Sequence, residues 1–307
     1  MTAGLLAKTA LFPLHIWLPP AHGGAPAAAS AVLSALVIKG SWFLVLRLWL
    51  DVMPSVAGVQ AAQLMAGLGA AAIVVGSVVA LRQQRLKLLV AYSTVAQIGY
   101  LFLLFPLAFD AAGDMLLRDV AVTAGVLQAI AHATAKAGMF MAAGLVYARL
   151  GHDRIDELAG AGRALPLAVA AFLIGGLALM GVLPSGAYLA KKLLLASAEE
   201  SGQWWWSWVL QGGAAFTAGY VVLIGVRVLP FLLPVSIPGV STVFGFAIIL
   251  ISLAITRGIV EAQAQLAAVV RDGGGINQFG AIHGGSASGR QQGAKGKGFR
   301  RQTPAVS

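Results

Sequence analysis

The chain has 307 residues, of which 59% are hydrophobic and only 10% are charged. A soluble domain usually carries about 25% charged residues, so this composition excludes an ordinary soluble protein and predicts that lipid surrounds most of the chain. The sequence has no cysteine, which excludes disulfides, cysteine-ligated iron–sulfur clusters and thiol chemistry.

The net charge of +10 could indicate nucleic-acid binding, but the placement of the basic residues indicates a membrane protein. Most Lys and Arg residues lie between apolar runs or near the C-terminus, where membrane topology places them. We therefore expect the lipid bilayer as the surrounding medium, and we expect no nucleic-acid partner.

The apolar runs predict the secondary structure. A membrane-spanning helix needs about 20 mostly apolar residues, and the sequence holds about eight such runs. In chain order the expected spans are 1–18, 27–50, 55–81, 87–108, 117–149, 164–198, 204–232 and 237–266. We therefore expect an all-α, polytopic bundle of transmembrane helices over residues 1–271. Residues 272–307 are rich in Gly, Ser, Gln and Lys and predict a disordered basic tail.

Two of the runs contain a predicted helix break. The first run is interrupted at Pro13, within KTALFPLHIWLPP, and the run 164–198 is interrupted at Pro184, within GVLPSG. Proline lacks the backbone N–H that a helix interior needs. A broken helix at membrane depth is tolerated only where it is buried in protein or lines a water-filled cavity. We expect both breaks to occupy such a place.

Basic residues near the span ends predict the orientation. One basic edge precedes the fourth span and another follows the fifth, so the positive-inside rule places both at the cytoplasm. The residues of these edges are Arg82, Arg85, Lys87, Arg149, Arg154 and Arg163. Strict alternation of eight spans would place the basic tail outside, which conflicts with the same rule.

Four lysines lie within apolar runs rather than clearly at their ends: Lys8, Lys39, Lys136 and Lys191. A lysine at the centre of a spanning helix costs about 2.5–3.5 kcal/mol on insertion scales. No Asp or Glu lies clearly in the middle of a span to neutralise these charges. We therefore expect the four lysines to face protein or water rather than lipid.

Polar side chains extend from one of these lysines along a predicted helix face. Gln128, His132 and Lys136 are spaced four residues apart and so share one face. Ser93 and Gln97 form a similar pair on the preceding span. Because burial and neighbouring positive charge both favour release of a proton from a cation, such a stripe could carry protons.

Each candidate also has a structural interpretation. Lys39 could extend its ammonium group to the membrane surface, and Lys87, beside Arg85, could serve only as a topology charge. His15 and His22 flank the proline-rich break and are more typical of structural residues with satisfied hydrogen bonds. His132 alone would be more typical of a packed core residue. Lys136 on the same face favours function.

Other chemistry has no motif in the sequence. A phosphate-binding P-loop, a dinucleotide fingerprint and zinc-ligand spacing are all missing from it. We therefore expect no catalytic cofactor or metal on this chain, and no redox or nucleotide chemistry.

Four ordered blocks of the sequence match a known pattern. They are KTALFPLHIWLPPAHGGAPAAASAVLSALVIKG, RLKLLVAYSTVAQIGYLFL, IAHATAKAGMFMAAG and GVLPSGAYLAKKLLL. On these blocks, across residues 1–200, the chain resembles the antiporter-like membrane subunits of respiratory complex I (NADH:quinone oxidoreductase), membrane hydrogenases and Mrp-type cation/proton antiporters. The resemblance implies a multi-pass subunit of a larger complex, and we expect it in the bacterial inner membrane.

The resemblance implies a role for each buried cation. Lys8 would lie in the first broken helix and serve one half-channel. Lys39 would be the connecting lysine on the next helix. His132 and Lys136 would belong to the second half-channel, and Lys191 would be the terminal lysine on the second broken helix. In the family these residues pass protons along a hydrated axis near the membrane midplane, built from inverted repeats with broken helices.

The chain also departs from the family pattern. Family members carry several helices, and a glutamate that pairs with the first lysine, before the helix that corresponds to Lys8. The chain thus resembles the C-terminal half of the usual subunit, and we expect another chain to supply the front helices. Gln128 stands where many members carry histidine. Lys87 matches a lysine of the second block, which leaves a proton-transfer role and a topology role equally open.

Three functions follow as hypotheses. The first is proton translocation by a non-redox subunit of a complex I-like or Mrp-like assembly, with Na⁺ as an alternative exchanged ion. The second is a structural membrane scaffold whose channel is incomplete. The third is an energising subunit for inorganic-carbon uptake, as in some relatives of the family.

Overall fold

The computed structural model describes residues 1–54, 58–110, 112–113 and 118–228, without the side chains of 118 and 119. The expected span 237–266, the domain boundary at 271 and the expected basic tail lie outside these ranges. Within them the regular elements are helices, apart from one isolated bridge between Arg85 and Arg154. The predicted all-α class is confirmed.

Five described helices are long and apolar enough to cross a membrane: Ala27–Val52, Val59–Leu81, Leu86–Leu107, Val120–Leu150 and Trp205–Val228. They coincide with five of the expected spans to within a few residues at each end. The chain is therefore a multi-pass membrane protein. Two further expected spans are the broken helices, and the last expected span lies outside the described residues.

The first expected span, 1–18, contains one short helix and a long break, and the next helix begins at its last residue. α1 (Thr2–Thr9) ends at Ala10, whose φ of 61° is a left-handed conformation that stops the helix. The chain then passes Pro13 before α2 (Leu18–Gly24) begins with a proline in its first turn. The predicted break at Pro13 thus occupies residues 10–17.

The run 164–198 also divides, after a short connection through η3 (Ile155–Glu157) and α9 (Ala161–Ala164). α10 (Pro166–Met180) ends at Gly181, whose φ of 91° is left-handed and favours glycine. α11 (Gly186–Glu200) begins after Ser185, whose hydroxyl accepts a hydrogen bond from the Tyr188 N–H. The predicted break at Pro184 is therefore a true helix end followed by a capped start.

The second expected span is continuous but irregular. α3 (Ala27–Val32) and α4 (Ile38–Arg47) are joined by the π-helical segment η1 (Leu33–Val37), and a second π-helical segment, η2 (Leu48–Val52), ends the span. A π-helical turn disturbs the regular backbone pairing and occurs often at functional sites. Lys39 lies two residues after the end of η1.

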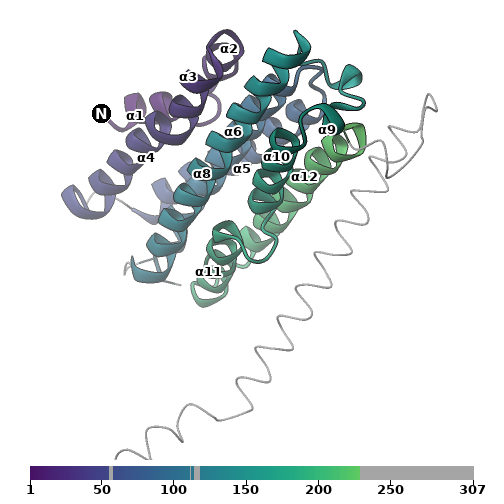
Figure 1. Ribbon diagram of the computed structural model, residues 1–307. Coiled ribbons are helices and arrows are strands. Elements are labelled where there is room, and N and C mark those ends of the chain that lie inside the picture. The colour runs from purple at the N-terminus through teal and green to yellow at the C-terminus, as the bar shows by residue number, and fades with distance from the viewer. Residues whose placement is uncertain (55–57, 111, 114–117, 229–307) are drawn as a thin grey trace, which may run out of the picture. The chain divides into compact units, whose positions relative to one another are not determined.

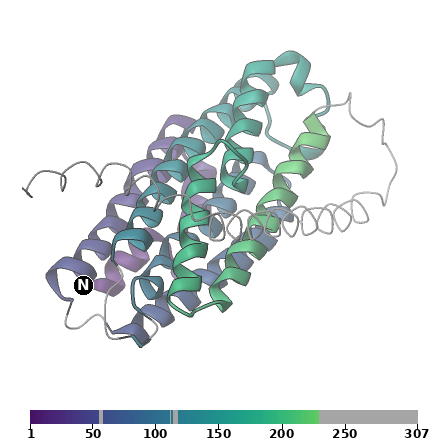
Figure 2. The ribbon, with the colours of Figure 1, turned by 90° about the horizontal axis from the view of Figure 1, so that it is seen from below.

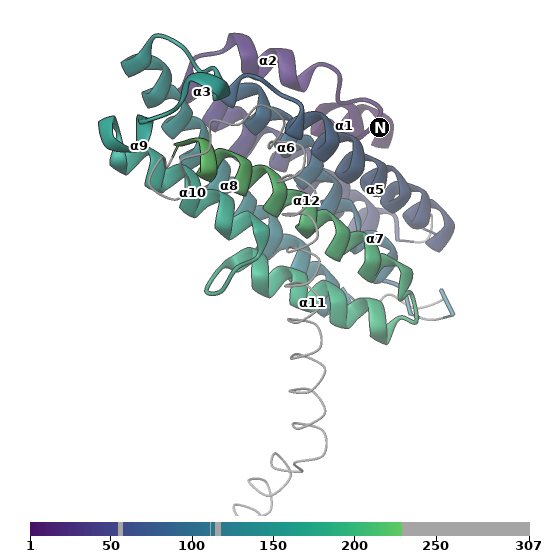
Figure 3. The same cartoon turned by 90° about the vertical axis from the view of Figure 1, so that its right-hand side faces the viewer.

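The helix α6 (Leu86–Phe102), with its extension α7 (Leu104–Leu107), lies inside the bundle. Of the 18-residue apolar stretch that could span the membrane, 89% is buried here, against 44–50% in the other four spanning helices. α5 (Val59–Leu81), α8 (Arg118–Leu150) and α12 (Trp205–Val228) pack around it. The N-terminal helices and α12 lie on opposite sides of α8 in both views (Figures 1 and 2). Figure 3 shows α12 running alongside α10.

Glycines allow α5 and α6 to approach backbone to backbone. A Cβ atom at Gly99 would overlap the carbonyl oxygen of Gly69 and lie 2.8 Å from Ile73. A Cβ atom at Gly76 would lie 2.6 Å from the backbone nitrogen of Ala96. Small residues at such positions are the usual means of close helix packing in membranes. This close pairing fixes α6, which carries several of the candidate polar residues.

The glycine contact predicts a stability effect. We expect Gly99→Ala to destabilise the protein by about 1–3 kcal/mol, because the added methyl group forces two buried backbones apart. Thermal loss of the monodisperse peak in detergent, measured by size-exclusion chromatography, checks this. The control is Gly138→Ala in α8, where an added Cβ meets nothing within 4 Å. Equal melting of the two variants would contradict the packing account.

Candidate functional site

Lys136 of α8 reaches across to α6. Its side chain is fully buried, and its Nζ donates to Ser93 Oγ at 2.5 Å and to the Val90 carbonyl at 3.3 Å. Ser93 Oγ in turn donates to the same carbonyl at 2.9 Å. The ammonium group is therefore held by neutral oxygens on a neighbouring helix. The predicted face of α8 does meet the predicted polar pair of α6.

A second set of side-chain hydrogen bonds joins α8, α6 and α12. Gln128 Nε2 of α8 donates to Gln97 Oε1 of α6 at 3.1 Å. Gln97 Nε2 donates to Thr217 Oγ1 of α12 at 3.2 Å, and Thr217 Oγ1 donates to the Gly213 carbonyl at 3.0 Å. All three side chains are buried. Gln128 and Gln97 were candidates from the sequence, and Thr217 was not.

His132 is within electrostatic reach of both Lys39 and Lys136. It is fully buried, and neither of its ring nitrogens has a hydrogen-bond partner among the described residues. A packed core histidine normally finds a partner for at least one nitrogen. The position beside two cations therefore favours the functional interpretation over the structural one.

Lys39 is buried in the middle of the continuous helix Ala27–Val52. Its Nζ donates to the Ser34 carbonyl within the π-helical segment. The alternative in which Lys39 extends to the membrane surface is wrong, because its ammonium group bends back along its own helix. Ser34 Oγ lies 3.5 Å from Thr94 Oγ1 of α6, which connects this helix to the centre of the bundle.

Lys191 of α11, after the second break, binds the C-terminal end of α10, before the break. Its Nζ donates to the carbonyls of Leu179 and Met180 at 3.1 and 3.0 Å. These carbonyls end α10, so they lack helix partners and form the negative end of its dipole. The Lys191 stem packs against Gly181, where a Cβ would lie 3.3 Å from its Cδ. The break thus builds a cation site from backbone.

Lys87 occupies the basic edge of the bundle. Its Nζ donates to the Ala25 carbonyl just after α2, and its backbone N–H donates to Asp153 Oδ2 at 3.3 Å. Asp153 is 3% exposed and also accepts from Arg85 Nε at 2.9 Å. This cluster fastens the start of α6 to the loop after α8. The arrangement gives Lys87 a structural task, and its role in proton transfer stays a prediction.

Lys8 differs from the other buried-lysine candidates. Its side chain is exposed on α1, and it forms no hydrogen bond or ion pair with the described residues. The next residue, Thr9, is buried and donates to Ser41 Oγ of α4 at 2.9 Å. The face of α1 that carries Lys8 therefore points away from the rest of the described bundle.

His22 is a residue that the sequence interpretation misjudged. We expected a structural histidine with satisfied hydrogen bonds, but both ring nitrogens are buried without a partner in the described part of the chain. Its ring stacks on Phe140, with 4.4 Å between ring centres. Lys39, Lys87 and Lys136 all act on it electrostatically. The lysine spacing gave no signal for this histidine, because it joins the cluster from a different helix.

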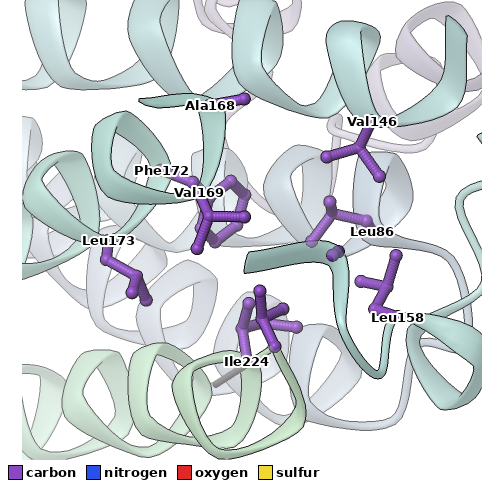
Figure 4. A pocket seen from close by; sticks show the side chains of 10 residues that line it. Leu86, Val146, Leu158, Ala168, Val169, Phe172, Leu173 and Ile224 are labelled. Atoms are coloured by element: carbon purple, nitrogen blue, oxygen red, sulfur yellow. The ribbon is translucent and has the colours of Figure 1, made fainter. Parts of the chain in front are cut away.

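The described ranges lack clustered metal-ligating side chains and contain one small apolar void of note. No group of three or more metal-ligating side chains occurs there. A void of about 10 Å³ lies between α8, α10 and α12 and is lined only by apolar side chains (Figure 4). Leu86, Phe172 and Ile224 are among its walls, and it is too small and too apolar for a polar substrate.

The comparisons with known proteins agree with this geometry. The profile of the family described as NADH:quinone oxidoreductase/Mrp antiporter, TM, matches residues 1–217. A second profile, Exopolysaccharide synthesis, ExoD, matches the short stretch 213–261. NADH-quinone oxidoreductase subunit N of Desulforudis audaxviator is 34% identical over 221 residues. That alignment covers 72% of this chain and 42% of the relative, so the chain spans less than half of the relative's length.

Solved structures show the same fold. A chain of the Mrp complex from Dietzia sp. is similar with a TM-score of 0.67 and 25% identity, over 74% of this chain and 40% of that chain. A chain of respiratory complex I from Thermus thermophilus is similar with a TM-score of 0.62 and 25% identity, over 74% and 46%. The chain belongs to the NADH:quinone oxidoreductase/Mrp antiporter family of membrane subunits.

Proposed function

We propose that the chain translocates protons across the membrane as a non-redox subunit of a complex I-like or Mrp-like assembly. The observation that carries this proposal is a set of four buried ionisable side chains: Lys39, His132, Lys136 and Lys191. The three lysines donate to uncharged oxygen atoms, and His132 has no hydrogen-bond partner among the described residues. Four ionisable side chains in an apolar bundle mark an ion pathway by default. The family membership supports the same function.

The arrangement provides a physical means of moving a proton. A proton on Lys39 repels a proton on His132 or Lys136 through the low-dielectric interior. An arriving proton therefore pushes one already present toward Lys191. Lys191 can release it at the second broken helix, where the backbone carbonyls of α10 bind the amino group more weakly once it is neutral.

The chemistry of the axis favours H⁺ over Na⁺. Sodium, like other hard cations, prefers several oxygen ligands, with carboxylates prominent among them. Asp153 is the one buried acid among the residues that the structure describes, and it lies at the edge of the bundle on Arg85. Exchange for Na⁺ would need oxygen ligands beyond the buried acids of the described residues.

We infer that a second membrane subunit covers Lys8. An exposed lysine in the first broken helix would face lipid unless another protein or water met it. A helix with a carboxylate opposite Lys8 would neutralise it and complete the first half-channel. We propose the bacterial inner membrane as the location of such an assembly. The alternative, a scaffold with an incomplete channel, rests on the same exposed lysine.

The central test is removal of the buried lysines. We expect Lys136→Ala and Lys191→Ala each to lower proton transport by more than about tenfold, because each breaks the row of protonatable groups. Transport is measured with a pH-sensitive dye in proteoliposomes that contain the purified assembly. Size-exclusion chromatography confirms that each variant assembles.

The matched control is Lys192→Ala, the neighbouring lysine of α11, which is exposed. It should leave transport unchanged. Normal proton transport by both Lys136→Ala and Lys191→Ala would reject the channel and favour the scaffold.

The exposed face of α1 gives a separate prediction. A photo-crosslinking amino acid at position 8 should link the chain to another membrane subunit of the purified assembly, because protein covers that face. The same amino acid at Leu167, which is 85% exposed on α10, should link mainly to lipid. Links to lipid alone from position 8 would contradict the covering subunit, without touching the lysine row of the second half-channel.

A further inference from the structure

The described contacts that lead from Lys136 toward Lys191 run through uncharged polar side chains. Lys136 Nζ donates to Ser93 Oγ at 2.5 Å. At the other end, Lys191 Nζ lies 5.1 Å from the centre of the Tyr100 ring. The side chains between these two points come from α6 and α12. They consist of hydroxyl and amide groups rather than acids or histidines.

Tyr220 of α12 occupies the middle of this stretch. It is fully buried, and it lies beside Ser93, Gln97 and Thr217. Its hydroxyl nevertheless makes no direct hydrogen bond of normal geometry within the described chain. Buried hydroxyls nearly always have a partner. A water molecule between the hydroxyl and its three polar neighbours would provide one.

Thr217 connects the middle of the stretch to the Lys191 end. It accepts from Gln97 at 3.2 Å and also lies beside Tyr100. Gly213 makes this approach possible, because a Cβ there would overlap the Tyr100 hydroxyl. The Tyr100 hydroxyl points at α12, where it reaches the Leu210 carbonyl at 3.5 Å. Thus α12 presents Thr217 and the Leu210 carbonyl to the polar side chains of α6.

Gln128 of α8 also has a buried polar atom without a hydrogen-bond partner in the described chain. Its amide nitrogen donates to Gln97, but its carbonyl oxygen is buried with no partner among the described groups. The unpaired atoms of Tyr220, Gln128 and His132 thus come from two helices that flank the Gln97 side chain. Buried water typically fills such positions and makes about three hydrogen bonds.

We propose that Thr217 and Tyr220 of α12 are positioning residues that hold a short water chain between Lys136 and Lys191. The proposal rests on the proposed proton translocation. The Lys136 ammonium gives a proton to the first water, each water passes a different proton onward, and neutral Lys191 accepts the last one. Lys136 ends neutral and Lys191 charged. The two hydroxyls only orient the waters, so their own charge never changes.

A purely adhesive role for the same groups is the competing interpretation. A single hydrogen bond between membrane helices contributes little on average to their association, so its loss alone would change assembly little. A water-positioning role instead predicts a loss of proton transport without a loss of assembly. The two roles therefore differ in what each conservative variant changes.

The test uses Tyr220→Phe and Thr217→Val in the full chain, within the assembly purified with it and reconstituted into proteoliposomes. We expect each to lower the proton transport rate about tenfold, while Thr217→Ser, which keeps the hydroxyl, stays close to the wild type. The ratio of rates in H₂O and D₂O should rise in Tyr220→Phe, because proton transfer through the gap becomes limiting.

Two variants match these chemically and lie elsewhere on the helices. Tyr147→Phe removes a hydroxyl from a side chain that is 53% exposed on α8. Thr134→Val removes a hydroxyl that bonds only to its own helix, at Ile130 and Ala131. Both should transport protons at the wild-type rate.

The outcomes separate this proposal from the proposed function. Wild-type transport and isotope ratio in Tyr220→Phe and Thr217→Val, with Lys136→Ala inactive, would overturn the positioning role and leave proton translocation standing. Normal transport in Lys136→Ala would overturn both. If Thr217→Val fails to assemble, Tyr220→Phe decides alone, because it removes a single oxygen atom and keeps the buried ring in place.

Discussion

The structure depends on one constraint: an ammonium group buried among apolar helices must find oxygen atoms, and here those oxygens carry no charge. Lys136 uses a serine hydroxyl and a backbone carbonyl, and Lys39 and Lys191 use backbone carbonyls alone. A carboxylate partner would hold each proton firmly in a low-dielectric interior. Neutral partners stabilise the charged form less, which leaves each lysine able to give up its proton.

For Lys39 and Lys191, irregular helix geometry provides these neutral oxygens. A regular helix uses its carbonyls internally, so they are free only at helix ends and distortions. The break after Met180 frees the carbonyls that hold Lys191, and the π-helical segment before Lys39 contains the carbonyl that holds it. The features that look like defects in the bundle are thus the cation sites. Close glycine packing between α5 and α6 keeps the bundle firm around them.

The sequence predicted the helices and the breaks because lipid imposes strict rules on both. Apolar runs must be helical in a membrane, and Pro13 and Pro184 had to interrupt two of them. The buried lysines were predictable from their cost. The i,i+4 rule placed Gln128, His132 and Lys136 on one face, but it could not say which helix that face would meet. Thr217 and Tyr220 therefore escaped notice, although they are polar residues in an apolar run. His22 was misjudged because Phe140 and Lys136, which act on it in the fold, are distant in sequence.

The proposed proton pathway is a hydrated row of protonatable side chains across this subunit. Direct observation of water tests this proposal most sharply. Electron cryomicroscopy of the purified assembly, at a resolution where ordered water is visible, would examine the gaps beside His132 and between Lys136 and Lys191. The account predicts water density next to the unpaired atoms of His132, Gln128 and Tyr220. A dry, fully packed interior along this row would contradict it.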